Sequence, residues 1–95
     1  MDSRVRQIVR LLRKHGARKV ELFGSYARGE ARPDSDIDVL VDFKEKKSLL
    51  EIVGIEQELE EAIGVKVDLL TRKWISPYLL DRIEQEAVVV FDDTR

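Results

Sequence analysis

The sequence predicts an α+β fold in which a mixed β-sheet carries helices packed on one face. In residues 36–43 an apolar side chain at every odd position alternates with Asp36, Asp38, Leu40 and Asp42, the period-2 pattern of a strand with one buried face. Residues 49–63 place apolar side chains along one helical stripe between a capping serine and Gly64. Shorter helical and strand patterns elsewhere in the chain give the element order αβ(α)βαβαβ, in which the bracket marks a short helix or turn. We therefore expect one domain over residues 1–95, with carboxylates on the sheet face opposite the helices.

Length and composition restrict the class of protein. With 95 residues the chain can bury one modest core but has no room for a second substrate-binding domain. The absence of cysteine excludes disulfides and thiolate metal sites, and it suits a reducing cytoplasm. No apolar run approaches the length of a membrane span. We expect a cytoplasmic protein that does not associate with membranes.

The net charge of −2 is unevenly distributed. Residues 1–32 hold nine lysines and arginines against three acidic residues, and the remainder of the chain is acidic. Such a basic segment can attract nucleic acid or an acidic partner. We prefer the simpler interpretation that it is the solvated face of the first helix, so nucleic acid is not an expected ligand.

The N-terminal elements follow from local patterns. Ser3 is the expected cap of a helix that ends near Gly16, and residues 20–23 form a short apolar strand. The strand stops at Gly24-Ser25, followed by a short helix or turn through Arg28. A Gly-Ser turn leaving a strand presents free backbone N–H groups and a hydroxyl, which suits a phosphate group.

Asp36 and Asp38 are spaced i, i+2 in the second predicted strand, so their side chains point the same way. Paired carboxylates repel each other unless a cation lies between them. Mg²⁺ is usually held by one or two carboxylates together with substrate phosphates. An alternative is a calcium loop of the EF-hand type beginning at Asp34, but its sixth position requires glycine and here holds Val39.

The C-terminal half supplies three further elements. A strand around Val67 places Asp68 on the face opposite the core, and the connector after it holds Trp74, which we expect to cover the edge of the core. Ser76-Pro77 opens a third helix with Leu79, Leu80, Ile83 and Ala87 facing inward, and residues 88–91 form a last apolar strand.

The combined pattern resembles a known signature. Gly24-Ser25, Arg28, Asp36-x-Asp38 and a later strand aspartate, Asp68, are similar to the motif of the DNA polymerase β-type nucleotidyltransferases, and the short length is most similar to the minimal nucleotidyltransferase (MNT) family. The resemblance implies that Asp36, Asp38 and Asp68 are catalytic and bind two Mg²⁺ ions. It also implies that Gly24, Ser25 and Arg28 bind the phosphates of ATP.

The same resemblance implies a function. MNT proteins are antitoxins of HEPN-family toxins, so the expected reaction is transfer of AMP from ATP to a hydroxyl, a tyrosine of the toxin being the acceptor. A homo-oligomer or a hetero-complex with the toxin is the expected assembly. Two alternatives remain open: a non-catalytic antitoxin that acts by binding alone, and a small-molecule nucleotidyltransferase whose acceptor site comes from a partner or second copy.

Overall fold

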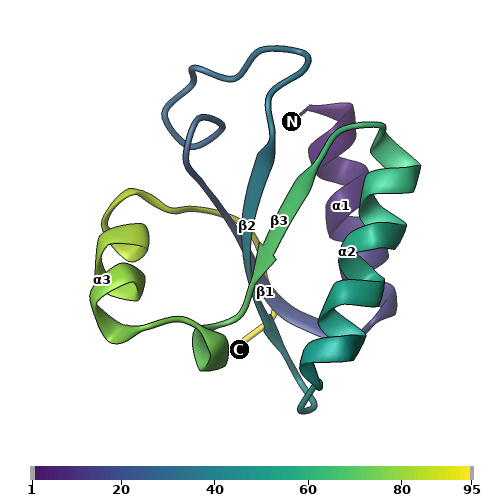
Figure 1. The fold of residues 1–95 in the computed structure, drawn as a ribbon, viewed down its shortest axis with the longest axis vertical. Helices are drawn as coiled ribbons and strands as arrows, with labels where there is room; N and C mark the ends of the chain where they lie inside the picture. Colours follow the sequence, from purple (N-terminus) through teal and green to yellow (C-terminus); the bar gives the residue numbers. More distant parts are fainter. Residues whose placement is uncertain (1, 95) are drawn as a thin grey trace.

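The computed structural model describes residues 2–94 and shows a four-stranded mixed sheet with three α-helices (Figure 1). The sheet has the strand order β3-β2-β1-β4, in which β2 and β3 are parallel and the other neighbours are antiparallel. Along the chain the elements are α1 (Ser3–Lys14), β1 (Ala17–Phe23), β2 (Ile37–Phe43), α2 (Leu49–Ile63), β3 (Val67–Leu70), the 3₁₀ turn η1 (Arg72–Trp74), α3 (Pro77–Glu86) and β4 (Val88–Asp92). The expected α+β class and mixed sheet are confirmed.

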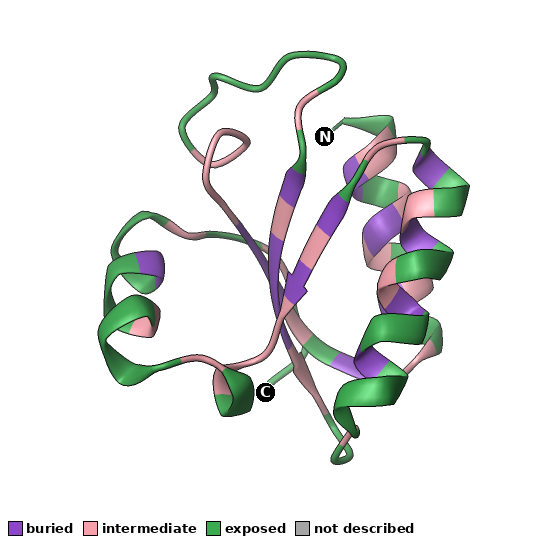
Figure 2. Cartoon of the chain, viewed as in Figure 1, coloured by how far each residue is buried: buried purple, intermediate pink, exposed green. Residues whose placement is uncertain are grey.

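The main core lies between one face of the sheet and the helices α1 and α2 (Figure 2). Alternate strand residues such as Val20, Val39 and Val67 point into it and are fully buried. Ile8 of α1 and Leu59 of α2 close it from the helix side and are also fully buried. The alternation read in the sequence therefore decides which strand side chains are apolar and inward, and which are left on the other face.

Helix α3 lies on the side of the sheet opposite α1 and α2 (Figure 1). The expected helix-covered face is thus formed by two helices, while the third partly covers the face that carries the acidic residues. Of the α3 side chains expected to face inward, Ile83 is buried, but Leu79 is 48% exposed. The reason is that α3 is a single short helix on that face, so only one narrow strip of it reaches the sheet.

A charged cluster joins the sheet to α3 and η1. Arg72 donates hydrogen bonds to Glu21 of β1 at 2.7 Å, to Asp42 of β2 at 2.6 Å and to Glu84 of α3 at 2.9 Å. Burial lowers the pKa of Arg72, but these three hydrogen bonds outweigh it and raise the pKa above its ordinary value. Glu21 is only 6% exposed, so the guanidinium neutralises a buried carboxylate.

Several local expectations need correction. Asp2, and not Ser3, caps α1, because its carboxylate accepts the N–H of Arg4 at 2.7 Å. Strand β1 begins at Ala17, earlier than residue 20, since its partners on both sides extend the ladder. Trp74 is 51% exposed and does not cover the core. No helix within residues 2–94 is long and apolar enough to span a bilayer.

Candidate active site

Two carboxylates meet where β2 and β3 run side by side. The parallel register pairs Asp38 of β2 with Asp68 of β3, and both side chains are half-buried on the face opposite the main core. Asp68 also lies 3.9 Å from the ammonium group of Lys66, measured between Nζ and Oδ1. The sheet thus brings together two of the three carboxylates that the sequence predicted, 30 residues apart in the chain.

The environment of Asp38 disfavours its ionised form. The pKa of Asp38 is raised from its ordinary value of 3.8 to about 6, mainly by burial and then by the hydrogen bond and negative charge of Asp68. Asp36 adds a smaller repulsion, while the guanidinium of Arg28 opposes the rise. A pair of carboxylates in this state gains stability from a proton or from a bound cation.

Asp36 is placed differently from its expected position. It is exposed and lies just outside β2, which begins at Ile37, whereas Asp38 is half-buried within the strand. Its charge still acts on Asp38. Across residues 2–94, no three acidic, histidine or cysteine side chains are gathered closely enough to form a set of metal ligands. The donor chemistry nevertheless fits Mg²⁺. Two neighbouring carboxylates supply the oxygen ligands that a hard cation prefers, and the cation would relieve the repulsion between their charges.

The Gly24 turn lies directly against Asp38. Gly24 has a φ of +69°, and a Cβ placed on it would overlap the Asp38 carboxylate. Its strand neighbour Phe23 pairs with Asp38 across the β1–β2 ladder, which explains this closeness. Glycine is required here for two independent reasons, the left-handed backbone and the missing space. The predicted turn and the predicted acidic pair are therefore parts of one site.

The residues after Gly24 form consecutive turns without a regular helix. The Arg28 N–H donates to the Gly24 carbonyl at 3.1 Å, and the Glu30 N–H donates to the Ser25 carbonyl at 2.9 Å. Ser25 is half-buried beside the site. The exposed guanidinium of Arg28 contacts Glu30 at 3.0 Å. Free N–H groups at this point belong to the turn itself. Because no helix begins here, no helix dipole adds to the attraction of an anion.

One residue at the site was not found by sequence reasoning. Glu86, at the end of α3, accepts the Gly24 backbone N–H at 3.1 Å and contacts the Arg28 guanidinium at 3.5 Å, both through Oε1. A carboxylate therefore lies where the sequence placed a phosphate group. Only the return of α3 across this face of the sheet reveals the contact, and no local pattern around Glu86 signals it.

Comparison with known proteins gives consistent matches. Residues 3–90 match the family model for the nucleotidyltransferase domain. The chain is 53% identical over 85 residues to a Methanocaldococcus jannaschii protein named as a candidate protein adenylyltransferase, covering 90% of this chain and 91% of the relative. It is 41% identical over 80 residues to the protein adenylyltransferase MntA of Thermococcus cleftensis, covering 84% and 81%.

Solved structures agree with this grouping. The fold superposes with a TM-score of 0.84 on a chain from a crystal structure of a toxin–antitoxin complex with AMP-PNP. The two chains are 25% identical, and the match covers 94% of this chain and 73% of the other. The similarity therefore extends over almost the whole of this chain.

Proposed function

This chain belongs to the nucleotidyltransferase domain family, and we propose that residues 1–95 act as one domain that transfers AMP from ATP to a protein hydroxyl. The acceptor in this proposal is a tyrosine of a cognate HEPN-family toxin, so that the chain acts as its antitoxin. The observation that carries the proposal is the pairing of Asp38 with Asp68 directly beside the Gly24 turn.

The acidic residues are proposed to hold the metal. Asp38 and Asp68 would supply adjacent oxygen ligands, and Asp36 would join them from the loop. Their role in this proposal is to bind two Mg²⁺ ions. When bound, Mg²⁺ supplies neutralisation of phosphate charge and activation of the acceptor hydroxyl. The pKa of Asp38, raised to about 6, supports this assignment, because its ionised carboxylate is destabilised in the folded protein and a bound cation would stabilise it.

The turn residues are proposed to bind the triphosphate. The Gly24 N–H and the Arg28 guanidinium are both directed at an anion, because both already contact the Glu86 carboxylate. A phosphate oxygen that replaces this carboxylate would take over the same donors. The Ser25 hydroxyl lies next to them in the chain and would add one neutral hydrogen bond.

The donor and the partner are proposed from relatives. Two relatives that cover most of this chain are named for protein adenylyltransfer, which supports AMP transfer to a protein. The complex with AMP-PNP supports ATP as the donor and a toxin as the partner. A hetero-complex with the toxin is therefore the proposed assembly.

A direct assay tests the proposal. The chain is incubated with ATP, Mg²⁺ and the protein encoded by the adjacent gene, and the mass of each protein is then measured. We expect one or more AMP groups on the partner, carried by a tyrosine. The double variant Asp36→Asn with Asp38→Asn should leave the partner unmodified. The control Asp34→Asn changes an exposed residue of the same loop and should still modify the partner.

The same variants separate catalysis from binding. The double change preserves side-chain volume and removes like charges, so the fold and its contact surfaces should persist. Loss of neutralisation in cells, at expression equal to wild type, supports the enzyme. If the double variant neutralises the toxin fully, the chain acts by sequestration and the catalytic proposal is wrong.

A further inference from the structure

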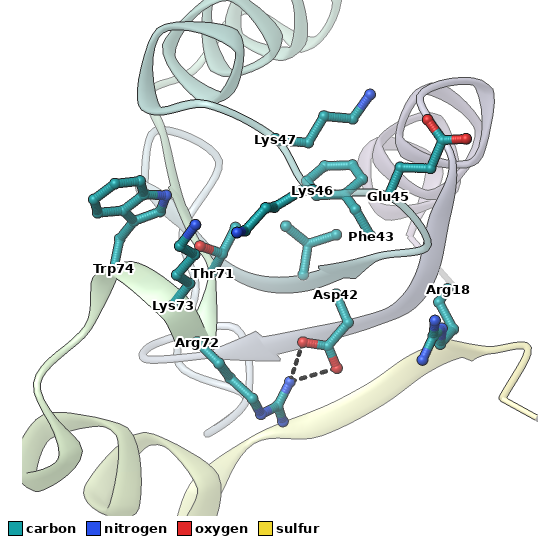
Figure 3. A pocket seen from close by; sticks show the side chains of 11 residues that line it. Arg18, Asp42, Phe43, Glu45, Lys46, Lys47, Thr71, Arg72, Lys73 and Trp74 are labelled. Atoms are coloured by element: carbon teal, nitrogen blue, oxygen red, sulfur yellow. Dashed lines mark hydrogen bonds and ion pairs between the residues drawn. The ribbon is translucent and has the colours of Figure 1, made fainter.

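A cleft lies at the end of the β1–β2 ladder opposite the Gly24 turn, and Figure 3 shows its lining residues. It has a volume of about 280 Å³ and lies where β2 ends at Phe43 and where Thr71 follows β3. Asp38 is four residues away from Asp42 along β2, which corresponds to roughly 13 Å in a strand. The cleft is therefore separate from the acidic pair.

Two lysine side chains converge on this cleft. Lys46 comes from the loop after β2 and Lys73 from η1, and Figure 3 shows their ammonium ends close together beside Thr71. Partial desolvation lowers the pKa of Lys73 from its ordinary value, and the charge and contact of Lys46 lower it further. Among the ion pairs of residues 2–94 none involves either ammonium group, and the Lys73 ammonium lies over the ring of Trp74, 5.3 Å from its centroid. Two like charges held this close would be relieved by an anion.

The acidic residues of the cleft do not fill this role. Asp42 is held by Arg72, with both carboxylate oxygens at 2.6 Å from the guanidinium. Glu45 points away from the two ammonium groups (Figure 3). The positive charge of Lys46 and Lys73 is consequently left without an internal counter-ion.

Two further groups at the cleft can contact a ligand. The Thr71 hydroxyl oxygen is buried and is the one such side-chain atom without a hydrogen-bond partner in the described part of the chain. A buried polar atom in this state costs free energy until a partner is supplied. Trp74 leaves 51% of its surface exposed at the edge of the same cleft. An exposed indole ring beside a cationic pair is a surface on which a nucleobase can stack.

We propose that this cleft binds a nucleoside 5′-monophosphate unit, with Lys46, Lys73 and the Thr71 hydroxyl on the phosphate and Trp74 against the base. The ammonium groups donate charge-assisted hydrogen bonds to phosphate oxygens. The unit is either a free nucleotide or the 5′ end of an RNA strand, since both present the same phosphate and ring. This inference does not depend on the proposed AMP transfer.

Trp74 provides the assay, because it is the only tryptophan of the chain. Its fluorescence is followed while AMP is added in buffer with EDTA, and calorimetry repeats the titration. We expect the double variant Lys46→Gln with Lys73→Gln to weaken AMP binding at least tenfold. Lys44→Gln is the matched control, because it removes one charge from the same loop, where Lys44 pairs with Asp93 outside the cleft. It should bind AMP as wild type does.

Ligand analogues test which groups are recognised. Adenosine should bind at least tenfold more weakly than AMP, and Asp38→Asn should leave AMP binding unchanged, which separates this cleft from the proposed catalytic site. A 5′-phosphorylated oligoadenylate that binds more tightly than AMP identifies an RNA end, and weaker binding identifies a free nucleotide. Equal binding of adenosine and AMP, unchanged binding in the double lysine variant, or no binding of AMP by either method would overturn the proposal.

Discussion

Replacing Asp38 by asparagine should stabilise the folded protein at neutral pH in the absence of metal. The pKa of Asp38 is about 6 in the folded state against an ordinary value of 3.8, so the folded protein holds this proton more tightly than the unfolded chain does. The stabilisation from this proton is complete below pH 3.8 and is lost as the pH rises to about 6. Above that pH the ionised group destabilises the fold.

The size of the effect follows from the two pKa values. Their difference corresponds to about 3 kcal/mol, and the solvent exposure of Asp38 reduces the expected effect to about 1–2 kcal/mol. Asparagine has no charge to bury, so Asp38→Asn should gain this amount at pH 7.5 and almost nothing at pH 4. Titrations of groups that do not interact with Asp38 cancel in the comparison, whereas the titration of Asp68 is coupled to Asp38 and changes with it.

Urea unfolding followed by circular dichroism measures the difference. The free energy of unfolding is compared between wild type and Asp38→Asn at both pH values in buffer with EDTA, with Asp34→Asn as an exposed control. Saturating Mg²⁺ should then stabilise wild type and leave Asp38→Asn nearly unchanged. A difference between the two proteins that does not vary with pH would refute the reasoning.

Three further changes have expected outcomes. Glu86→Gln should increase ATP affinity several-fold in calorimetry, because the neutral amide competes less well for the Gly24 N–H; equal affinities would show that Glu86 does not compete with phosphate. Gly24→Ala should cost about 1–3 kcal/mol in urea unfolding and abolish turnover, since its Cβ meets a carboxylate at positive φ, and an active, stable variant would contradict this. Arg72→Ala should cost roughly 2–4 kcal/mol, because the buried Glu21 would keep only the longer ion pair with Lys19 at 4.0 Å, and a loss below 1 kcal/mol would indicate that the cluster contributes little.

Much of the candidate site could be predicted because its parts are local patterns. The Gly24-Ser25 turn follows from a strand that stops at glycine, and the acidic alternation of residues 36–43 places Asp38 on the face opposite the core. The face on which Asp68 lies follows in the same way from its own strand, while its place in the site was implied by the family resemblance. These features depend on backbone periodicity within a few residues, which the sequence records directly.

Other features could not be predicted because they depend on long-range packing. The sequence alone determined the α+β class, the order of the elements, the turn and the acidic positions.

The tertiary structure decided the strand order β3-β2-β1-β4 and thereby the contact between Asp38 and Asp68. It also placed α3 across the acidic face, which brings Glu86 to Gly24 over 62 residues of chain. Local periodicity fixes which way a side chain points, but only the pairing of distant strands and helices fixes what it meets.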